Sequence, residues 1–192
     1  MELIRAWTRQ HVSVLQELEK KGVYRAKKEY ICEKNGAISE YYLDLYNWYS
    51  RCASQIIPRP EGVVYPIWLF LDEVSKLPPI EGTVVLELEI PRDQIIITDV
   101  ERWGYRVNYM YIPLNDEDAR SHENELAKNG IFNEPAIIQT DKGNFYPLLR
   151  RKIVDSWKRV FDPPETGAGV VQGTVWELRI EWLKGVTAGG DR

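Results

Sequence analysis

The segment of residues 83–99, TVVLELEIPRDQIIITD, begins with apolar residues at every second position, alternating with mostly acidic ones. The apolar residues of its first half share one face of a β-strand, because side chains two positions apart point to the same side. These residues are Val84, Leu86, Leu88 and Ile90. Pro91 lacks the N–H that a strand ladder needs, and an apolar run follows at residues 95–97. The stretch predicts two successive strands at the centre of a sheet.

Helical spacing predicts the longest helix over residues 39–56. Its apolar stripe consists of Tyr42, Leu45, Tyr46, Tyr49, Cys52, Ala53 and Ile56. Tyr41 and Trp48 lie off this stripe, and they either widen the buried face or line a surface. Two further helices are expected, one capped by Thr8 and ended by Gly22 and one over residues 149–161. Residues 115–128 are expected to form a solvent-side helix or an ordered loop, because their apolar face is thin.

The remaining apolar segments predict strands. They cover residues 3–7, 23–31, 65–71 and 174–183, and the aromatic-rich residues 103–111 are expected to form a strand or the wall of a cleft. In residues 174–183 the side chains of Trp176, Leu178, Ile180 and Trp182 alternate with polar ones. The Pro- and Gly-rich residues 163–173 are expected to form a mobile loop.

Strands and helices interleave irregularly, which is typical of an α+β fold with a mixed or antiparallel sheet and about four helices. The length of 192 residues fits one domain. We expect a single globular domain over residues 1–186, followed by a flexible tail over 187–192.

Charge and composition narrow the classes of function. The net charge is −4, and no basic run exceeds Arg150-Arg151-Lys152, which disfavours non-specific binding to nucleic acid. No segment approaches the roughly 20 apolar residues of a membrane span, and the N-terminus does not resemble a signal peptide. Cys32 and Cys52 are too few for a disulfide framework, so we expect buried thiols and a cytoplasmic location.

Several familiar catalytic motifs are absent from the sequence. It contains no dinucleotide-binding glycine motif, no P-loop and no nucleophile elbow. His11 and His122 are isolated from other metal-ligating residues, so we expect no metal site and a surface or capping role for each histidine. Any catalysis would therefore depend on carboxylates, hydroxyls and aromatic rings.

Glu177 is the strongest single candidate for a catalytic residue. It lies on the polar face of the predicted strand directly after the predicted loop, where a carboxylate could orient a substrate hydroxyl. Arg179 and Glu181 share this face. Simple solvation with an arginine–glutamate ion pair explains the three charges equally well.

A series of ordered motifs resembles a bacterial and phage family known only as a domain of unknown function. The motifs are Trp7-Thr8-Arg9-Gln10, Tyr65-Pro66-Ile67-Trp68, the LELEIP of residues 86–91, Ser156-Trp157, Val160-Phe161-Asp162, Gln172 and Trp176-Glu177-Leu178. The resemblance covers nearly the whole chain and implies no activity.

The layout of the elements also resembles small ADP-ribosyltransferase-type domains. That resemblance implies NAD as the substrate, with Arg5 or Thr8 contacting it from the first strand and Tyr65 or Trp68 stacking near the nicotinamide. Glu177 would be the catalytic glutamate, and residues 163–173 would recognise a protein or nucleic-acid target. This hypothesis suits a toxin or a phage–host conflict.

Two other hypotheses come from different classes. The chain could be a non-catalytic inhibitor of phage or mobile-element type that docks on a host protein through an aromatic surface. It could also be a housekeeping domain with a small-molecule ligand. A concavity shared by Trp68, Tyr105 and Glu177 would favour the enzyme, whereas a flat exposed patch around Tyr41 and Trp48 would favour the docking protein.

Overall fold

The strand predicted from residues 83–91 lies at the centre of the fold. In the computed structural model, which describes residues 2–162 and 170–189, it is β4 (Thr83–Pro91). It pairs along its whole length with β1 (Leu3–His11), from Leu3 opposite Pro91 to His11 opposite Thr83. A short 3-10 turn, η2 (Arg92–Gln94), leads into β5 (Ile96–Asp99). The predicted pair of successive strands is confirmed.

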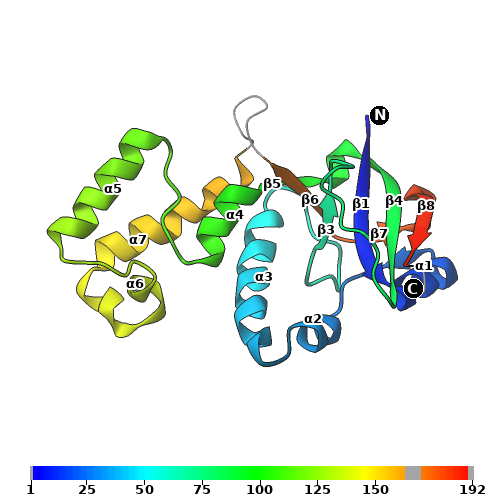
Figure 1. Cartoon of the computed structure of the whole chain (residues 1–192), viewed down its shortest axis with the longest axis horizontal. Coiled ribbons are helices and arrows are strands. Elements are labelled where there is room, and N and C mark those ends of the chain that lie inside the picture. The colour runs from blue at the N-terminus through cyan, green and yellow to red at the C-terminus, as the bar shows by residue number, and fades with distance from the viewer. Residues whose placement is uncertain (1, 163–169, 190–192) are drawn as a thin grey trace. The chain divides into compact units, whose positions relative to one another are not determined.

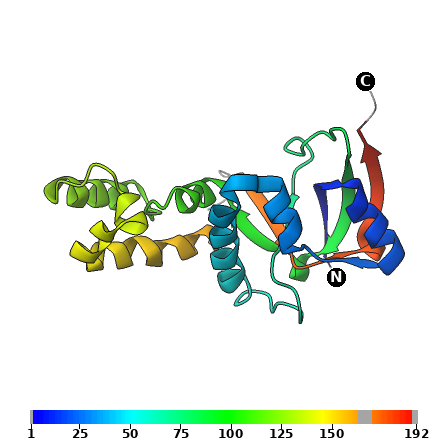
Figure 2. The same ribbon diagram turned by 90° about the horizontal axis from the view of Figure 1, so that it is seen from below.

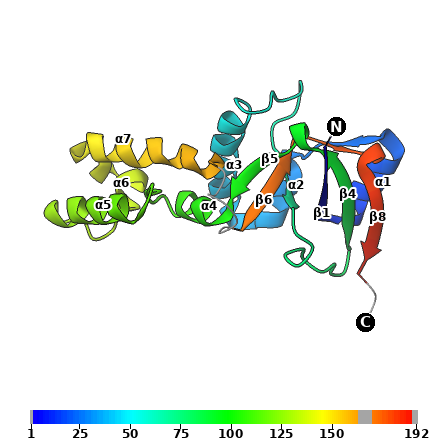
Figure 3. The same cartoon turned by 90° about the horizontal axis from the view of Figure 1, so that it is seen from above.

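The main sheet contains six strands of the described chain in the order β5-β6-β3-β1-β4-β8 (Figures 1 and 3). The other members are β3 (Ile67–Phe70), β6 (Val171–Val175) and β8 (Leu183–Ala188). β3 pairs antiparallel with β1 and with β6, and β8 pairs antiparallel with β4. The sheet and its helices confirm the predicted α+β class.

One face of the sheet forms the main hydrophobic core. Alternate strand residues such as Ala6, Leu69 and Leu86 are fully buried there. Helix α1 (Val12–Lys21) adds Val14 and Leu18 to this core and ends at Gly22 as predicted, where the glycine adopts a left-handed conformation.

Thr8 does not begin α1, contrary to our expectation. Continuous pairing with β4 extends β1 to His11, so Thr8 remains within the strand. His11 is the cap instead, since its Nδ1 accepts the N–H of Ser13 at 3.2 Å. The predicted capping role of this histidine is confirmed.

Helix α3 (Ser39–Ala53) supplies aromatic side chains to the opposite face of the sheet. Its Tyr49 hydroxyl lies 2.9 Å from Thr174 Oγ1, and its ring lies 5.0 Å from that of Trp68. The shorter α2 (Lys28–Asn35) contacts α3 and is joined to it by η1 (Gly36–Ile38) (Figures 1 and 2). The expectation of extended chain over residues 23–31 holds for β2 (Val23–Tyr24) and for the β-bridge at Ala26, and it is wrong from Lys28, where α2 begins.

The predicted strand over residues 174–183 is broken into several elements. After β6, the two residues of β7 (Leu178–Arg179) leave the main sheet and pair with β2, and η5 (Ile180–Trp182) then turns the chain into β8. Trp176, Leu178 and Trp182 are buried as expected, but Ile180 is exposed because it belongs to the turn. A regular alternation does not distinguish one strand from two with different partners.

The last residues of the predicted loop and the first residues of the predicted tail belong to strands. Val171 to Gly173 belong to β6, while residues 163–169 lie outside the described part. Thr187 and Ala188 pair with Val85 and Val84 of β4, so these residues are strand rather than tail. Residues 190–192 lie outside the described part. Neither of the two described cysteines, Cys32 and Cys52, forms a disulfide, and both are half-buried rather than buried.

Contacts divide the chain into two compact units. Unit 1 comprises Met1–Ile97 with Val171–Arg192, and unit 2 comprises Thr98–Val170. The main sheet and the small β2–β7 sheet give unit 1 its core. The single-domain boundary expected at residue 186 stays a prediction.

Unit 2 is built from helices. Its elements are α4 (Val100–Val107), α5 (Asp116–Lys128), α6 (Ala136–Gln139), η3 (Asp141–Phe145), α7 (Pro147–Ser156) and η4 (Trp157–Phe161). Asn115 caps α5, and α7 with η4 forms the amphipathic segment predicted to end before Asp162.

The aromatic-rich segment after Asp99 begins as a helix and not as the expected strand, whereas Tyr105 and Tyr111 line a cavity, in agreement with the alternative expectation of a cleft wall. The carboxylate of Asp99 accepts the N–H of Arg102 at 3.0 Å and so caps α4. Arg106 of α4 is buried, with its guanidinium 4.0 Å from the centre of the Trp157 ring. Arg106 therefore joins α4 to η4 within unit 2.

Candidate functional site

Glu177 lies between two arginine side chains in unit 1. The β2–β7 register sets Val23 opposite Arg179 and Tyr24 opposite Leu178, so the next residues along each chain, Arg25 and Glu177, also meet. Glu177 Oε2 lies 3.0 Å from both Nε and Nη2 of Arg25. Glu177 Oε1 lies 3.0 Å from Nε and 2.9 Å from Nη2 of Arg179. Both carboxylate oxygens are thus engaged by guanidinium groups.

Burial differs sharply across this group of three. The Glu177 side chain is only 9% exposed, whereas those of Arg25 and Arg179 are 45% and 47% exposed. A buried carboxylate needs such partners, because an unpaired charge is expensive to desolvate. Two half-exposed arginine side chains are therefore fixed by ion pairs with one buried carboxylate.

The remaining Nη1 atoms of the two arginines make weaker contacts. Arg25 Nη1 donates to the carbonyl of Glu61 at 3.4 Å, and Arg179 Nη1 lies 3.7 Å from the exposed Glu181. The Arg179 guanidinium also lies 5.7 Å from the centre of the Trp182 ring. These arginines therefore keep donor capacity on the side away from Glu177.

Thr8 and Trp68 are neighbours, but their contact is structural. The buried Thr8 hydroxyl donates to the carbonyl of Trp68 at 2.9 Å and accepts from the amide of Gln10 at 2.7 Å. The Trp68 ring packs against Tyr49 and Tyr46 of α3. Thr8 therefore links β1 to β3, and the Trp68 ring packs β3 against α3.

Tyr65 lies within the same aromatic cluster. Its ring is 6.5 Å from that of Tyr46, and its backbone forms a bridge with Ala26. Burial raises the pKa of Tyr65 above its usual value, so the phenol is neutral at physiological pH. Ala26 directly follows Arg25, so the bridge places the backbone of Tyr65 beside the residue next to Arg25.

Arg5 is exposed and lies at the far end of the sheet. Trp7 is opposite Phe70 and Phe70 is opposite Gln172, so Arg5 is level with the start of β6 while Glu177 lies beyond its end. At about 3.3 Å per strand residue, the two are separated by on the order of 20 Å. Arg5 instead pairs with Glu87 on β4, with Nε 2.7 Å from Oε1. The structure therefore does not bring Arg5 and Glu177 into one site.

The aromatic residues of α3 form packing rather than a flat exposed patch. Trp48 and Tyr49 are buried, and Tyr41 is half-buried with its ring 5.4 Å from that of Tyr42. The enzyme hypothesis expected Trp68, Tyr105 and Glu177 to line one concavity. In the structure the Trp68 ring packs against α3, whereas the Glu177 carboxylate is bound by two arginines. Tyr105 belongs to unit 2.

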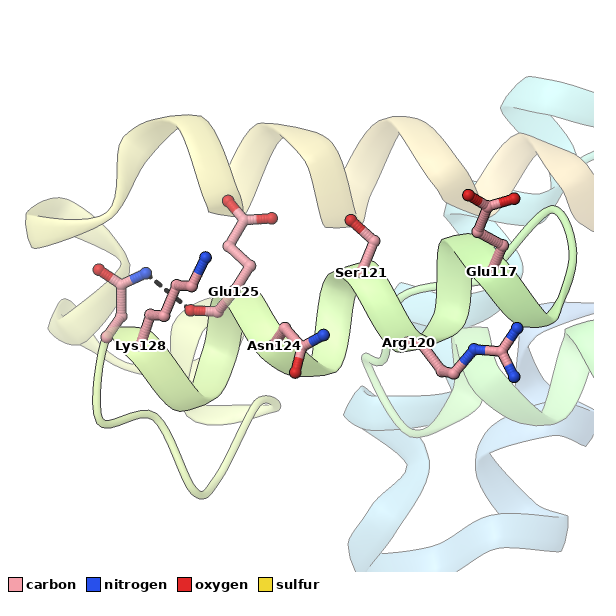
Figure 4. A pocket seen from close by; sticks show the side chains of 7 residues that line it. Glu117, Arg120, Ser121, Asn124, Glu125 and Lys128 are labelled. Carbon is pink, nitrogen blue, oxygen red and sulfur yellow. Dashed lines mark hydrogen bonds between the residues drawn. The ribbon is translucent and has the colours of Figure 1, made fainter.

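Figure 4 shows an open hollow on the polar face of α5. Its lining residues are Glu117, Arg120, Ser121, Asn124, Glu125, Lys128 and Asn129. Several polar groups here already pair within unit 2: Asn129 donates to the Glu125 carbonyl, and Lys152 of α7 lies 2.7 Å from Glu125 Oε2. One convex helix face cannot enclose a ligand, so we regard this hollow as a solvated surface.

Sequence reasoning missed one member of the Glu177 group and misjudged another. The sequence indicated that Arg179 could form an ion pair with a glutamate, and it does so with Glu177. It did not indicate that a second arginine, Arg25, would pair with the same carboxylate. Arg25 is 152 residues from Glu177 along the chain, and no local pattern links them. Within residues 2–162 and 170–189, no group of three metal-ligating side chains is assembled and no helix is long and apolar enough to cross a membrane.

These features define an α+β protein with a six-stranded sheet, among the described residues, and a carboxylate-supported arginine pair beside it. The chain belongs to the DUF3841 family, a domain of unknown function, whose model matches residues 5–184. The resemblance to a domain of unknown function is confirmed, and this match carries no link to ADP-ribosyltransferases. Comparison with curated proteins and with solved structures gave no match.

Proposed function

We propose that the protein binds NAD through its pyrophosphate at Arg25 and Arg179, with Glu177 as the residue that positions both arginines. The observation that carries this proposal is the double pairing of one buried carboxylate with two half-exposed guanidinium groups. The proposal keeps the substrate expected from the layout of the sequence. It transfers the phosphate contact from Arg5 to Arg25 and Arg179.

The charges favour an anionic ligand. Two guanidinium groups and Glu177 leave one net positive charge, and the exposed Glu181, 3.7 Å from Arg179 Nη1, offsets part of it. Arginine matches phosphate oxygens geometrically and is the usual residue for such contacts. Two neighbouring arginines suit two linked phosphate groups, as in a dinucleotide pyrophosphate. Fixing the guanidinium groups in advance lowers the entropy lost on binding.

ADP-ribosyl transfer is the reaction that this substrate would undergo under the proposal. The bond between the ribose and nicotinamide breaks with its electron pair leaving on nicotinamide, and a nucleophile of a target protein or nucleic acid bonds to the ribose carbon and loses a proton. A carboxylate stabilises the cationic character of the ribose in such cleavage. Glu177 could do so only after the pyrophosphate draws one guanidinium away from its oxygen. The expected cytoplasmic location belongs to the same proposal.

Binding can be measured separately from chemistry by isothermal titration calorimetry with NAD. We expect Arg25→Ala and Arg179→Ala each to weaken NAD binding about tenfold or more, because each removes a charge-assisted contact. Arg51→Ala is the matched control, since Arg51 is exposed on α3. ADP should compete with NAD, and nicotinamide alone should not. Unchanged affinity in both arginine variants, or no binding of NAD at all, would reject this site.

The transfer step is tested with labelled NAD, with and without cell lysate. Nicotinamide release or label transfer that is lost in Glu177→Gln would support a catalytic carboxylate. Binding without any turnover would leave an NAD-binding protein and reject the transferase. Absence of both would favour the non-catalytic docking protein, for which a pull-down of a protein partner is the next experiment.

A further inference from the structure

A second candidate site lies wholly within unit 2. A cavity of about 350 Å³ is bounded by α5, by the segment after it and by the chain that follows α4. Its apolar wall includes Leu126, Ile131 and the rings of Tyr105, Tyr111 and Phe132. This size and lining are typical of sites for small organic molecules.

The charged residues in the wall of this cavity are acidic. Glu123 and Glu134 line it, and no lysine or arginine does. His122 also lines the cavity, and even a protonated His122 would leave the wall with a net negative charge. A cavity with carboxylates and aromatic rings in its wall favours a cation and disfavours an anion.

Two cations near the cavity are already paired with carboxylates. Lys152 Nζ lies 5.0 Å from the centre of the Tyr111 ring, but also 2.7 Å from Glu125 Oε2. The Arg159 guanidinium lies 5.3 Å from the same ring centre, and its Nη1 is 3.4 Å from Asp118 Oδ2. Glu125 and Asp118 therefore offset these two charges, and Glu123 and Glu134 keep theirs.

Glu134 has one carboxylate oxygen that is free to accept a ligand. Its side chain is only 9% exposed, and Oε1 accepts the backbone N–H of Tyr111 at 2.6 Å and lies 3.1 Å from His122 Nε2. No donor in the described part of the chain bonds to Oε2, yet this oxygen is not fully buried. Because Glu134 lines the cavity with the small part of it that is exposed, a charged donor there would offset the cost of desolvating the carboxylate.

His122 is buried, contrary to the surface or capping role expected from the sequence. Its imidazole is stacked on the Tyr111 ring, with centroids 4.2 Å apart and planes 26° apart. His122 therefore covers one face of Tyr111 and holds Glu134 through Nε2. Tyr105 and Phe132 supply further rings to the wall, and Phe132 is 96% exposed, so it would gain stability if a ligand covered it.

We propose that this cavity binds a small organic cation, an ammonium group on an apolar or aromatic body. The ammonium group pairs with the free oxygen of Glu134 and with Glu123, and the body packs against Tyr105 and Phe132. The proposal is independent of NAD binding at Arg25 and Arg179, because the two sites are in different units.

The test compares three probes of similar shape and different charge by isothermal titration calorimetry at pH 7. These are 2-phenylethylamine, which is cationic, 2-phenylethanol, which is neutral, and 3-phenylpropionate, which is anionic. We expect the amine to bind about tenfold more tightly than the alcohol, because only the amine forms ion pairs, and the anion to bind most weakly. Alcohol or anion binding as tightly as the amine, or no amine binding at millimolar concentrations, would overturn the proposal.

Glu123→Gln tests the charge at an exposed position, where unfolding is not a risk. It should weaken amine binding several-fold and leave alcohol binding unchanged, since it removes a charge and keeps the shape. Glu117→Gln is the matched control, because Glu117 is an exposed carboxylate of the same helix that does not line the cavity. An equal loss of amine affinity in both variants would show a general charge effect and contradict the site.

Phe132→Ala tests the aromatic wall. It should weaken the binding of amine and alcohol alike, several-fold, without changing the melting temperature. Phe145→Ala is its control, because Phe145 is an 81% exposed aromatic residue of the same unit that does not line the cavity. Equal amine binding by the Phe132→Ala variant and the unaltered protein would also contradict the proposal.

Discussion

At the scale of single residues, Asp118 joins three parts of unit 2 through one carboxylate. Its oxygens accept the N–H of Leu114 at 2.8 Å and the Tyr111 hydroxyl at 2.8 and 3.0 Å, and Arg159 lies 3.4 Å away. The Leu114 N–H above all, then the Tyr111 hydroxyl and Arg159, lower the pKa of Asp118 below its ordinary value. The ionised form therefore stabilises the folded state.

Asp118→Asn should make unit 2 less stable at neutral pH, by about 1 kcal/mol in the free energy of unfolding. Because the pKa of Asp118 is lower in the folded than in the unfolded state, its contribution is present above about pH 4 and is lost as the pH falls through the folded-state pKa. The difference between variant and unaltered protein should shrink accordingly at acid pH. Urea unfolding at pH 7 and pH 3 measures both values.

Asp155→Asn is the control for this prediction. The Asp155 side chain is 66% exposed and pairs with the exposed Arg151, so its replacement should change stability by less than about 0.5 kcal/mol. If Asp118→Asn lowers the free energy of unfolding equally at pH 7 and pH 3, lost packing and not ionisation causes the effect.

Residue-level chemistry was only partly visible in the sequence. Glu177 could be singled out because a carboxylate between bulky apolar neighbours is unusual, and Arg179 two positions later was an evident partner. Arg25 could not be found, since only the pairing of β2 with β7 brings it to Glu177. His122 carried no signal at all, because Glu134 and Tyr111 reach it from outside its helix.

At the scale of elements, three glycines make a graded test of packing. A methyl group at Gly143 of η3 would lie 2.1 Å from the carbonyl oxygen of Ile137, which is backbone and cannot move alone. At Gly173 of β6 it would lie 2.9 Å from side-chain methyl groups of Ile95 and Leu71. At Gly104, inside α4, it would meet nothing within 4 Å.

We therefore expect the order of stability to be Gly104→Ala, unaltered protein, Gly173→Ala, Gly143→Ala. Gly104→Ala should stabilise by about 0.5–1 kcal/mol through helix propensity. Gly173→Ala should cost about 1 kcal/mol and Gly143→Ala about 2 kcal/mol or more. Melting temperatures of the three variants rank them. A destabilising Gly104→Ala would argue against a helix over residues 100–107.

The elements themselves were predicted where one face is buried and the other solvated. This holds for β4 and α3, whose apolar periodicity is local, while α5 was indicated by its local Asn115 cap. It fails over residues 174–183, where the alternation continues through a change of pairing partner and a turn. It also fails for α4, because packing against Trp157 makes a helix of an aromatic segment that suggests a strand.

At the scale of the whole molecule, unit 2 is an insertion between two neighbouring strands of the main sheet. β5 precedes it, β6 follows it, and the two strands are adjacent. The chain ends of the insertion also meet, since the N–H of Val100 donates to the carbonyl of Val170 at 3.1 Å. Close ends are typical of a segment that can be removed from its host.

Replacing residues 101–169 by a short Gly-Ser linker should therefore leave unit 1 folded. The core around Ala6, Leu69 and Leu86 belongs to unit 1, as do Arg25, Glu177 and Arg179. The shortened protein should unfold in one cooperative transition and bind NAD within about threefold of the full chain, because every proposed phosphate contact is retained. Arg25→Ala in the shortened protein controls for the NAD site, and a shortened protein that folds but loses NAD binding would show that unit 2 contributes to that site.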